Sequence, residues 1–332
     1  MSAAATVPVT VAAVVLVVGQ TDDPDTSGIG DLASSEATAS TTTPTTTASS
    51  TAAATTTTTL PVDAPTHLDQ PLGPGSSGEQ VLAVQTRLTE LGFAPGPIDG
   101  QFGNLTKAAV WAFEKLVVQV PRANATGVVT DEMWQFMQQP IAVRPRRPEA
   151  PTANHTEVYL PEQVVAFFVD DRPVMITHMS SGTGLVWREE VTIDVGEYGN
   201  DGDTPIVRGE IGTSITPGGL FSYDRFVDGI RNSALGGMWD PAYFNYGIAI
   251  HGALNVPLEP ASHGCIRIPL ALSETFHDNL ALGDAVYVWD GVKEPEDYGE
   301  QTPVFNRIDP DYVTTLPPTT STVPGATTTA EG

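Results

Sequence analysis

The amino-acid sequence predicts a multidomain protein in which a small all-α bundle of three helices precedes a mainly β domain. Apolar residues recur at helical spacing between residues 72 and 139, and short apolar runs typical of strands follow between residues 157 and 290. The flanking segments are rich in Thr, Ala and Pro and contain few large apolar side chains. Because they can bury too little to offset the entropy of ordering, they are expected to be a disordered tether and a disordered tail.

Changes in composition divide the chain into six segments. We expect a signal peptide or anchor at residues 1–25, a disordered Thr/Ser/Ala-rich linker at 26–67 and the helical domain at 68–141. A Pro/Arg-rich linker at 142–153, the β domain at 154–291, and a C-terminal extension with a disordered tail at 292–332 complete the chain.

An apolar run, VPVTVAAVVLVV, occupies residues 7–18. It has the length of a signal-peptide core and is shorter than a transmembrane helix requires. We therefore expect an exported protein. Cleavage of the run and its retention as a membrane anchor both remain open.

The chain is strongly acidic, with a formal net charge of -25, and no lysine or arginine precedes Arg87. Binding to nucleic acid needs concentrated basic side chains on the phosphates, so this composition argues against it. It also argues against adhesion to anionic lipid. Solubility outside the cell is a sufficient explanation for the acidic surface.

The helical domain is predicted from apolar positions repeating every three to four residues. Its first helix should end at Gly92, and the glycines Gly96 and Gly100 suit a tight turn that needs positive φ angles. The third helix is the short segment TDEMWQFMQQ. The predicted core positions are Val81, Leu82, Val84, Leu88 and Leu91 on the first helix, and Ala109, Val110, Phe113 and Leu116 on the second.

The β domain is predicted from the runs EVYL, VVAFFV, PVMITHM, EEVTIDV, YGIAIHG and AVYVWD. Asp170, Asp171 and Pro173 between the second and third runs predict a hairpin turn. Only ALSETFHDNLAL, at residues 271–282, is expected to be a helix.

Cys265 is the only cysteine of the chain. Exported proteins usually avoid a free thiol because it oxidises, so a lone cysteine is either inert and buried or chemically used. Its surroundings, IHGALNVPLEPASHGCIRIP, favour use as a nucleophile, because a nearby imidazole can accept the thiol proton.

Two histidines are candidates for that base. His263 lies two residues before Cys265 on a tight turn, where the geometry for direct proton transfer is restrictive, whereas His251 ends an apolar strand. We therefore prefer His251. Gly264 allows a sharp turn that can aim the amides of Gly264 and Cys265 at a developing oxyanion, and Arg267 can hold a substrate carboxylate or carbonyl.

The helical domain resembles the peptidoglycan-binding module that accompanies many wall hydrolases. The matching residues are GSSGEQVLAVQTRL, LGF, GPIDGQFG, TKAAVWAF and GVVTDEMW. The resemblance implies a noncatalytic unit that holds an enzyme on its polymeric substrate. The pair Phe113–Glu114 departs from the usual Phe-Gln, and a purely structural bundle remains the alternative.

The β domain resembles the YkuD-type L,D-transpeptidase family. The family pattern is a His-Gly pair at a strand end followed, after a loop, by Ser-His-Gly-Cys, an apolar residue and Arg or Asn. Here these residues are His251-Gly252 and Ser262-His263-Gly264-Cys265-Ile266-Arg267, and MSSG, TPGGLFSY and LGGMWDPAYF extend the likeness upstream.

The resemblance implies that Cys265 attacks the carbonyl before the terminal D-alanine of a tetrapeptide stem and forms a thioester. An amine of a neighbouring stem would then resolve it into a 3-3 cross-link. His251 would be the base and then the acid, oriented by a backbone carbonyl, while His263 and Gly252 would shape the site. Ser262 and Arg267 would bind substrate or brace the loop.

The same resemblance implies peptidoglycan as the partner, no cofactor, and a location in the cell wall or a periplasm-equivalent space. The oligomeric state is left open. Residues 187–211 are longer and more acidic than the connection in many relatives, which leaves the acceptor preference open as well.

The same residues allow alternative functions. Water in place of the amine would make the protein an L,D-carboxypeptidase, and a catalytically silent wall-binding protein is a further alternative. A papain-like or NlpC-type peptidase is disfavoured because its cysteine precedes its histidine. Zinc held by His251, His263 and Cys265 is disfavoured because no further ligand stands at suitable spacing.

Overall fold

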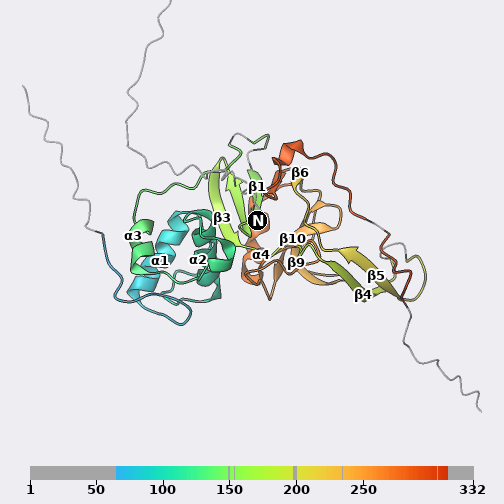
Figure 1. Ribbon diagram of the computed structural model, residues 1–332, viewed down its shortest axis with the longest axis horizontal. Coiled ribbons are helices and arrows are strands. Elements are labelled where there is room, and N and C mark those ends of the chain that lie inside the picture. The colour runs from blue at the N-terminus through green and yellow to red at the C-terminus, as the bar shows by residue number, and fades with distance from the viewer. Residues whose placement is uncertain are drawn as a thin grey trace, which may run out of the picture.

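The computed structural model describes residues 65–312, apart from 149, 153, 197–199, 234 and 305. The predicted apolar run at 7–18, most of the predicted linker at 26–67 and the end of the predicted tail lie outside these residues. Among the described residues, every helix is too short or too polar to span a bilayer. A helical domain and a β domain with a projecting arm lie side by side (Figure 1).

The helical domain contains α1 (Glu79–Glu90), α2 (Asn104–Leu116) and α3 (Asp131–Met137), which confirms the predicted three-helix bundle. A 3-10 turn, Arg122–Asn124, lies between α2 and α3. The buried Gln85 accepts the amide of Gly100 at 2.8 Å and donates to the carbonyl of Gln101 at 3.0 Å. One side chain on α1 thereby fixes the glycine-rich turn before α2.

The N-terminal boundary of this domain extends slightly beyond residue 68. Thr66 donates its amide to Gln138 at 2.8 Å, and His67 lies 2.9 Å from the carboxylate of Asp131 on α3. Residues 66 and 67, placed by composition in the linker, are therefore part of the folded bundle.

The β domain is built from two sheets and a two-stranded arm. One sheet has the order β3-β2-β1-β12-β6, and the other has the order β11-β10-β9-β7, with β8 paired to β9. The strands of the first sheet are β1 (Asn154–Tyr159), β2 (Val164–Val169), β3 (Arg172–His178), β6 (Gly219–Ser222) and β12 (Ala285–Trp289). Those of the second sheet are β7 (Arg225–Phe226), β8 (Ile230–Ser233), β9 (Gly236–Asn245), β10 (Ile248–Ala253) and β11 (Ile266–Pro269).

The hairpin predicted between β2 and β3 is confirmed, with Asp170 and Asp171 both at positive φ in the turn. The predicted helix at 271–282 is too long. α4 (Leu270–Phe276) gives way to a 3-10 turn, His277–Asn279. The chain must then turn into β12, and it does so at Gly283, with the Asp284 carboxylate accepting the amide of Ala281 at 2.6 Å.

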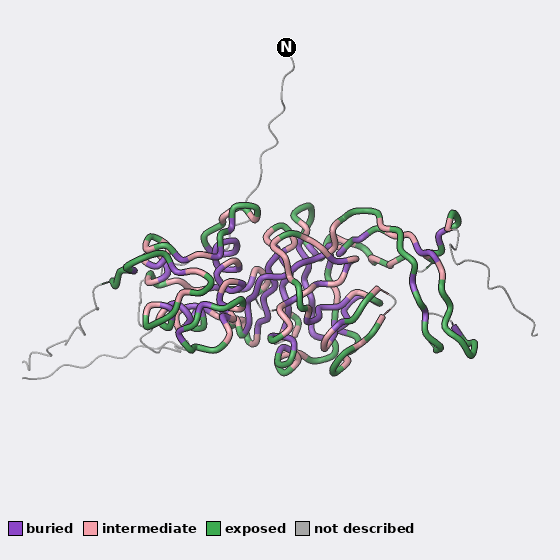
Figure 2. Tube along the Cα trace, turned by 90° about the horizontal axis from the view of Figure 1, so that it is seen from below, coloured by how far each residue is buried: buried purple, intermediate pink, exposed green. Residues whose placement is uncertain are grey.

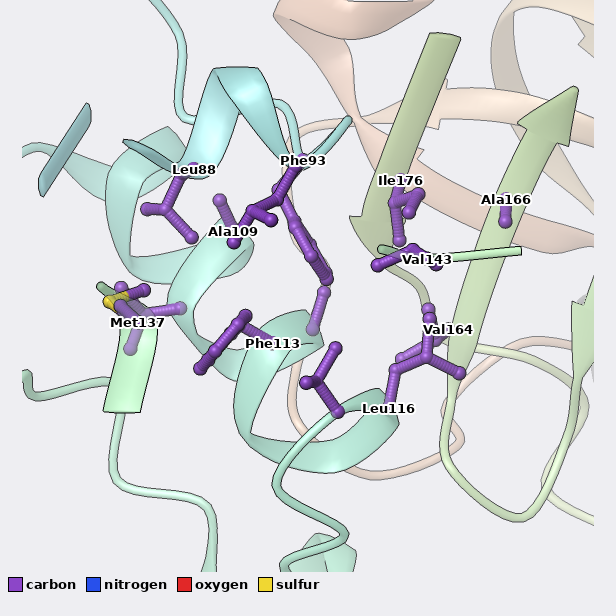
Figure 3. Close-up of a cluster of buried hydrophobic side chains, with 14 of the residues drawn as sticks. Leu88, Phe93, Ala109, Phe113, Leu116, Met137, Val143, Val164, Ala166 and Ile176 are labelled. Carbon is purple, nitrogen blue, oxygen red and sulfur yellow. The ribbon is translucent and has the colours of Figure 1, made fainter. Parts of the chain in front are cut away.

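Strand β2 is buried on both faces of the first sheet, which explains why it reads VVAFFV without polar alternation. Val165 and Phe167 face the core between the two sheets. Val164, Ala166 and Phe168 join the core of the helical domain. Figure 3 shows Phe93 and Leu116 of the bundle on the side that faces Val164 and Ile176 of the sheet, and Phe113 farther inside the bundle within the same cluster. The two domains thus share one continuous apolar core.

The arm consists of β4 (Val186–Ile193) paired antiparallel with β5 (Ile206–Thr213). Figure 2 shows much of its length exposed, in contrast to the buried strands at the centre of the molecule. Past a short 3-10 turn, Pro295–Asp297, the chain crosses the molecule and reaches β5 (Figure 1). We refer to residues 306–312, which pair with β5, as the C-terminal strap.

Candidate active site

A cavity of about 580 Å³ opens where the second sheet meets the arm and the residues that lead into the C-terminal strap. Six of the seven site residues predicted from sequence line it, and Gly252 does not. The six are His251, Ser262, His263, Gly264, Cys265 and Arg267.

Strand pairing brings the predicted nucleophile and base together. His251 lies on β10, which runs parallel to β11 with His251 opposite Arg267. Cys265 is the residue immediately before β11. Two segments separated by a loop therefore deliver a thiol and an imidazole to the same cavity.

A backbone carbonyl orients the buried ring of His251. Nδ1 lies 2.9 Å from the carbonyl oxygen of Gly252, which can only accept, so Nδ1 carries the proton and Nε2 is left as the basic nitrogen. Burial, with help from the charge of Arg267, lowers the pKa of His251 to about 4, against the opposing effect of the Gly252 carbonyl. His251 is therefore neutral at pH 7 and able to accept a proton.

Cys265 is half-buried, with Sγ 3.5 Å from the carbonyl oxygen of Gly247 and 4.0 Å from Sδ of Met238. Burial raises the pKa of the Cys265 thiol, while a hydrogen bond from the Ala249 backbone and the charges of Arg267 and Arg307 counteract it. The thiol is thus protonated at neutral pH. The cavity lining therefore holds a neutral thiol on Cys265 and a neutral imidazole on His251.

The loop before Cys265 is held by hydrogen bonds of its own. The Ser262 hydroxyl donates to the carbonyl of Cys265 at 2.5 Å and accepts the Gly264 amide at 3.1 Å. Thr216 Oγ1 donates to the carbonyl of Gly264 at 2.6 Å. Ser262 is buried and braces this turn, and the Gly264 amide is engaged within it. Of the two amides considered for an oxyanion, that of Cys265 therefore remains the candidate.

Gly264 has a steric reason to be glycine. Its φ is 147°, and a Cβ placed there would lie 2.8 Å from the carbonyl oxygen of Ile215. Gly252 has a similar reason, because a Cβ there would lie 2.3 Å from Oγ of Ser273 on α4. Gly252 shapes the site through close packing and through the carbonyl that orients His251.

His263 points toward the arm. Its Nε2 lies 2.9 Å from Oε1 of Glu189, and its ring packs edge-on against Trp187 with centroids 5.0 Å apart. The insertion at 187–211, which the sequence left without a role, therefore contacts the motif that carries Cys265. Among the described residues, no group of three or more His, Cys, Asp or Glu is placed to hold a metal ion.

Arg267 enters the cavity from β11. Its amide and carbonyl both bond to Ser180 at 2.9 Å, so the backbone beneath the side chain is fixed. Sequence reasoning missed several other lining residues. Met238 and Tyr243 fall within the LGGMWDPAYF segment already singled out, which was a usable signal, whereas Arg208 and Arg307 had none.

Comparison with known proteins agrees with this geometry. Residues 153–288 match the family of L,D-transpeptidase catalytic domains (YkuD), and residues 77–137 match a family of peptidoglycan-binding domains. No curated protein matches the chain. An L,D-transpeptidase from Xylanimonas cellulosilytica is 31% identical over 67% of this chain and 98% of its own, with a TM-score of 0.55.

The chain belongs to the L,D-transpeptidase family. Two other solved structures are more distant. An L,D-transpeptidase from Stackebrandtia nassauensis is 19% identical over 66% of this chain and 94% of its own, with a TM-score of 0.34. One from Mycobacterium tuberculosis is 17% identical over 42% of this chain and 58% of its own, with a TM-score of 0.27.

The two matched families follow each other along the chain in the same order as the two folded domains. The matched peptidoglycan-binding region covers α1, α2 and α3, and the matched catalytic region runs from β1 through most of β12. The C-terminal strap lies beyond both matched regions, although its residue Arg307 lines the cavity together with Pro303 and Val304 just before it.

Proposed function

We propose that this transpeptidase forms 3-3 cross-links in peptidoglycan through a thioester on Cys265. The donor would be a tetrapeptide stem whose third residue is of the meso-diaminopimelate type and whose fourth is D-alanine. Because such a substrate is part of the cell wall, the protein would have to be exported to act on it. The apolar run at residues 7–18 agrees with export.

In the acylation step, Nε2 of His251 takes the proton from the Cys265 thiol as sulfur attacks the carbonyl carbon before D-alanine. The developing oxyanion accepts a hydrogen bond from the Cys265 amide. When the intermediate collapses, the carbon–nitrogen bond breaks, and His251 returns its proton to the amine of the departing D-alanine. The products of this step are the thioester on Cys265 and free D-alanine.

In the second step, the amine of an acceptor stem attacks the thioester carbonyl. His251, neutral again, takes a proton from that amine. Collapse breaks the carbon–sulfur bond, and the leaving thiolate takes the proton back. The new amide bond is the cross-link, and Cys265 is restored as a thiol.

One observation carries the proposal: His251 and Cys265 line the same cavity, with Nδ1 of His251 locked onto the Gly252 carbonyl. This hydrogen bond fixes the tautomer of His251, so Nε2 is the basic nitrogen that is free to accept the thiol proton. The low pKa of His251 keeps it unprotonated, so it is ready to act as a base at neutral pH.

Intact-mass spectrometry of the full chain tests the proposal. The protein is incubated with a disaccharide tetrapeptide, with and without a second stem as acceptor. We expect an adduct on Cys265 that is lighter than the added stem by one D-alanine, and a cross-linked dimer when the acceptor is present. The Cys265→Ala variant should form neither product while keeping the circular dichroism of the parent.

The other outcomes have distinct meanings. Loss of D-alanine without a dimer would indicate L,D-carboxypeptidase action. Turnover by the Cys265→Ala variant would contradict the thioester. An unmodified, folded protein with every donor tried would favour a wall-binding role.

A further inference from the structure

Cationic side chains are concentrated around the catalytic cavity. Five arginines line it, out of 15 lysines and arginines in the whole chain, and among the described residues Glu210 is the one acidic side chain in the lining. The five are Arg208, Arg225, Arg231, Arg267 and Arg307. In a chain with a net charge of -25, such a concentration makes the cavity a local attractor for anions.

Several of these arginines already have partners. Arg208 pairs with Glu210 at 2.5 Å, and the guanidinium of Arg225 lies 3.8 Å from the ring centre of Tyr243. Arg267 and Arg307 differ, because no carboxylate among the described residues forms an ion pair with either one. Both nevertheless act on Cys265, since their charges counteract the rise in the pKa of its thiol.

The C-terminal strap holds Arg307 at the cavity. The carbonyl of Arg307 accepts the amide of Ile211 at 2.8 Å, and the amide of Asp309 donates to Gly209 at 3.0 Å. These bonds flank an antiparallel bridge between Ile308 of the strap and Glu210 of β5. Arg188 on β4 pairs with Asp309 at 3.0 Å and fixes the register.

The side chain of Arg307 is also positioned. Nε donates to the carbonyl of Val304 at 3.1 Å, and the guanidinium lies 5.7 Å from the ring centre of Trp187. Trp187 in turn packs on His263, two residues from the nucleophile. A half-buried guanidinium with a bonded Nε and no ion-paired carboxylate in the described part of the chain is suited to bind a carboxylate through its remaining N–H groups.

We propose that Arg307 and Arg267 together bind the carboxylate of the terminal D-alanine of the donor stem, so that the enzyme selects a free chain end. This inference rests on the proposed function. In D-alanine, a single carbon atom separates the carboxylate from the nitrogen that leaves. Arginines close to Cys265 can therefore reach this carboxylate during acylation. An internal peptide bond lacks that carboxylate and would be rejected.

Arg307 would act in the acylation step alone. The acceptor amine arrives after D-alanine has left, so resolution of the thioester does not need the clamp. A variant lacking the Arg307 charge should acylate slowly and cross-link at the normal rate once acylated.

The test compares a tetrapeptide stem with the same stem ending in D-alaninamide. For the full-length wild-type protein, we expect the second-order rate of acylation, followed by intact mass, to be about 10- to 100-fold higher for the acid, the range of one or two charge-assisted hydrogen bonds. Arg307→Gln should lose most of this preference by slowing only with the acid, and Arg307→Lys should keep part of it.

Lys293→Gln is the matched control. It removes one positive charge from the same C-terminal extension at an exposed position beside Tyr298, away from the cavity lining. It should behave as wild type with both stems. Circular dichroism melts of all variants show whether the fold is retained.

Binding separates this inference from the proposed function. Titration calorimetry in a Cys265→Ala background should show tighter binding of the acid than of the amide, and adding Arg307→Gln should remove the difference. That result supports the clamp even if the wild type forms no acyl-enzyme, which would count against the proposed function alone. Equal acylation of the acid and the amide, or a preference that survives Arg307→Gln, would overturn the clamp while leaving the thioester mechanism intact.

Discussion

Glu189 Oε1 lies 2.9 Å from His263 Nε2, and this contact ties the β4–β5 arm to the loop that carries the nucleophile. The pair is partly exposed, with 44% of the Glu189 side chain and 27% of the His263 side chain accessible. Such a pair adds little to global stability. Its effect is local, since it fixes how the arm stands over the cavity.

Glu189→Gln should therefore change substrate binding more than folding. We expect KM for the donor stem to rise a few-fold with kcat within about twofold, and the free energy of unfolding to change by less than about 1 kcal/mol. Steady-state kinetics and a denaturant titration measure both. Glu274→Gln, at an exposed position on α4, is the control, and an equal effect of the two substitutions would count against a role for the contact.

The pH dependence of kcat/KM should reflect the low pKa of His251. Above about pH 4 the imidazole is neutral and can accept the thiol proton, and below it protonation removes the base. Because the raised pKa of Cys265 keeps the thiol protonated at neutral pH, we expect activity to stay level from about pH 5 to 8. An acidic limb centred near 6.5 would show that His251 titrates as an ordinary histidine. Circular dichroism at each pH separates titration from unfolding.

Gly264→Ala should disable the nucleophile loop. The new Cβ would lie 2.8 Å from the carbonyl oxygen of Ile215 on a backbone at φ 147°, so the loop must shift. We expect kcat to fall by at least about tenfold and stability by about 1 to 3 kcal/mol. Gly299→Ala, where a Cβ meets no atom within 4 Å, should be neutral in both assays. Wild-type kcat in Gly264→Ala would refute the need for this conformation.

Lys115 should make the folded state less stable as pH falls toward neutrality. Its Nζ lies 2.8 Å from Nδ1 of His178 at the junction of the two domains, and burial, aided by Arg122, lowers its pKa to about 7. The unfolded chain keeps this proton up to about pH 10.5, so between pH 7 and 10 it binds more protons than the folded chain. The contribution of Lys115 to the free energy of unfolding therefore rises with pH, by on the order of 1 kcal/mol per pH unit.

Urea titrations at pH 7, 8 and 9 test the effect. Lys115→Met should flatten the rise in unfolding free energy, because the titrating group is gone. Lys107→Met, at a half-buried position on the same helix, should leave the rise unchanged. Identical slopes in wild type and Lys115→Met would disprove the assignment.

Much of the fold was accessible from sequence because local patterns matched the final packing. The helices of the bundle follow their apolar spacing, and the uniform apolar run of β2 reflects burial on both faces. β9 and β5 were missed for physical reasons. β9 contains Gly236, Gly237 and Pro241, and β5 forms part of a largely exposed arm, so neither shows an apolar period.

The placement of His251 and Cys265 at one cavity could be predicted because each lies beside a recognisable local sequence, although β10 continues past His251 to Ala253. His251 closes an apolar run, and Cys265 follows a turn that contains Gly264. Arg307 could not be found in this way. It lies in a segment without periodicity, and only tertiary pairing with β5 brings it to the cavity.

The shared core between the helical bundle and the first sheet sets the reach of the enzyme. Phe93 and Phe113 of the bundle and Ile176 and Val164 of the sheet belong to one buried cluster, so the described parts of the two domains are joined by packing as well as by the linker (Figure 3). Any glycan strand held by the bundle would then present its stems at one fixed distance and angle to Cys265. The enzyme would then cross-link only those stems whose position along the glycan strand matches this fixed distance and angle.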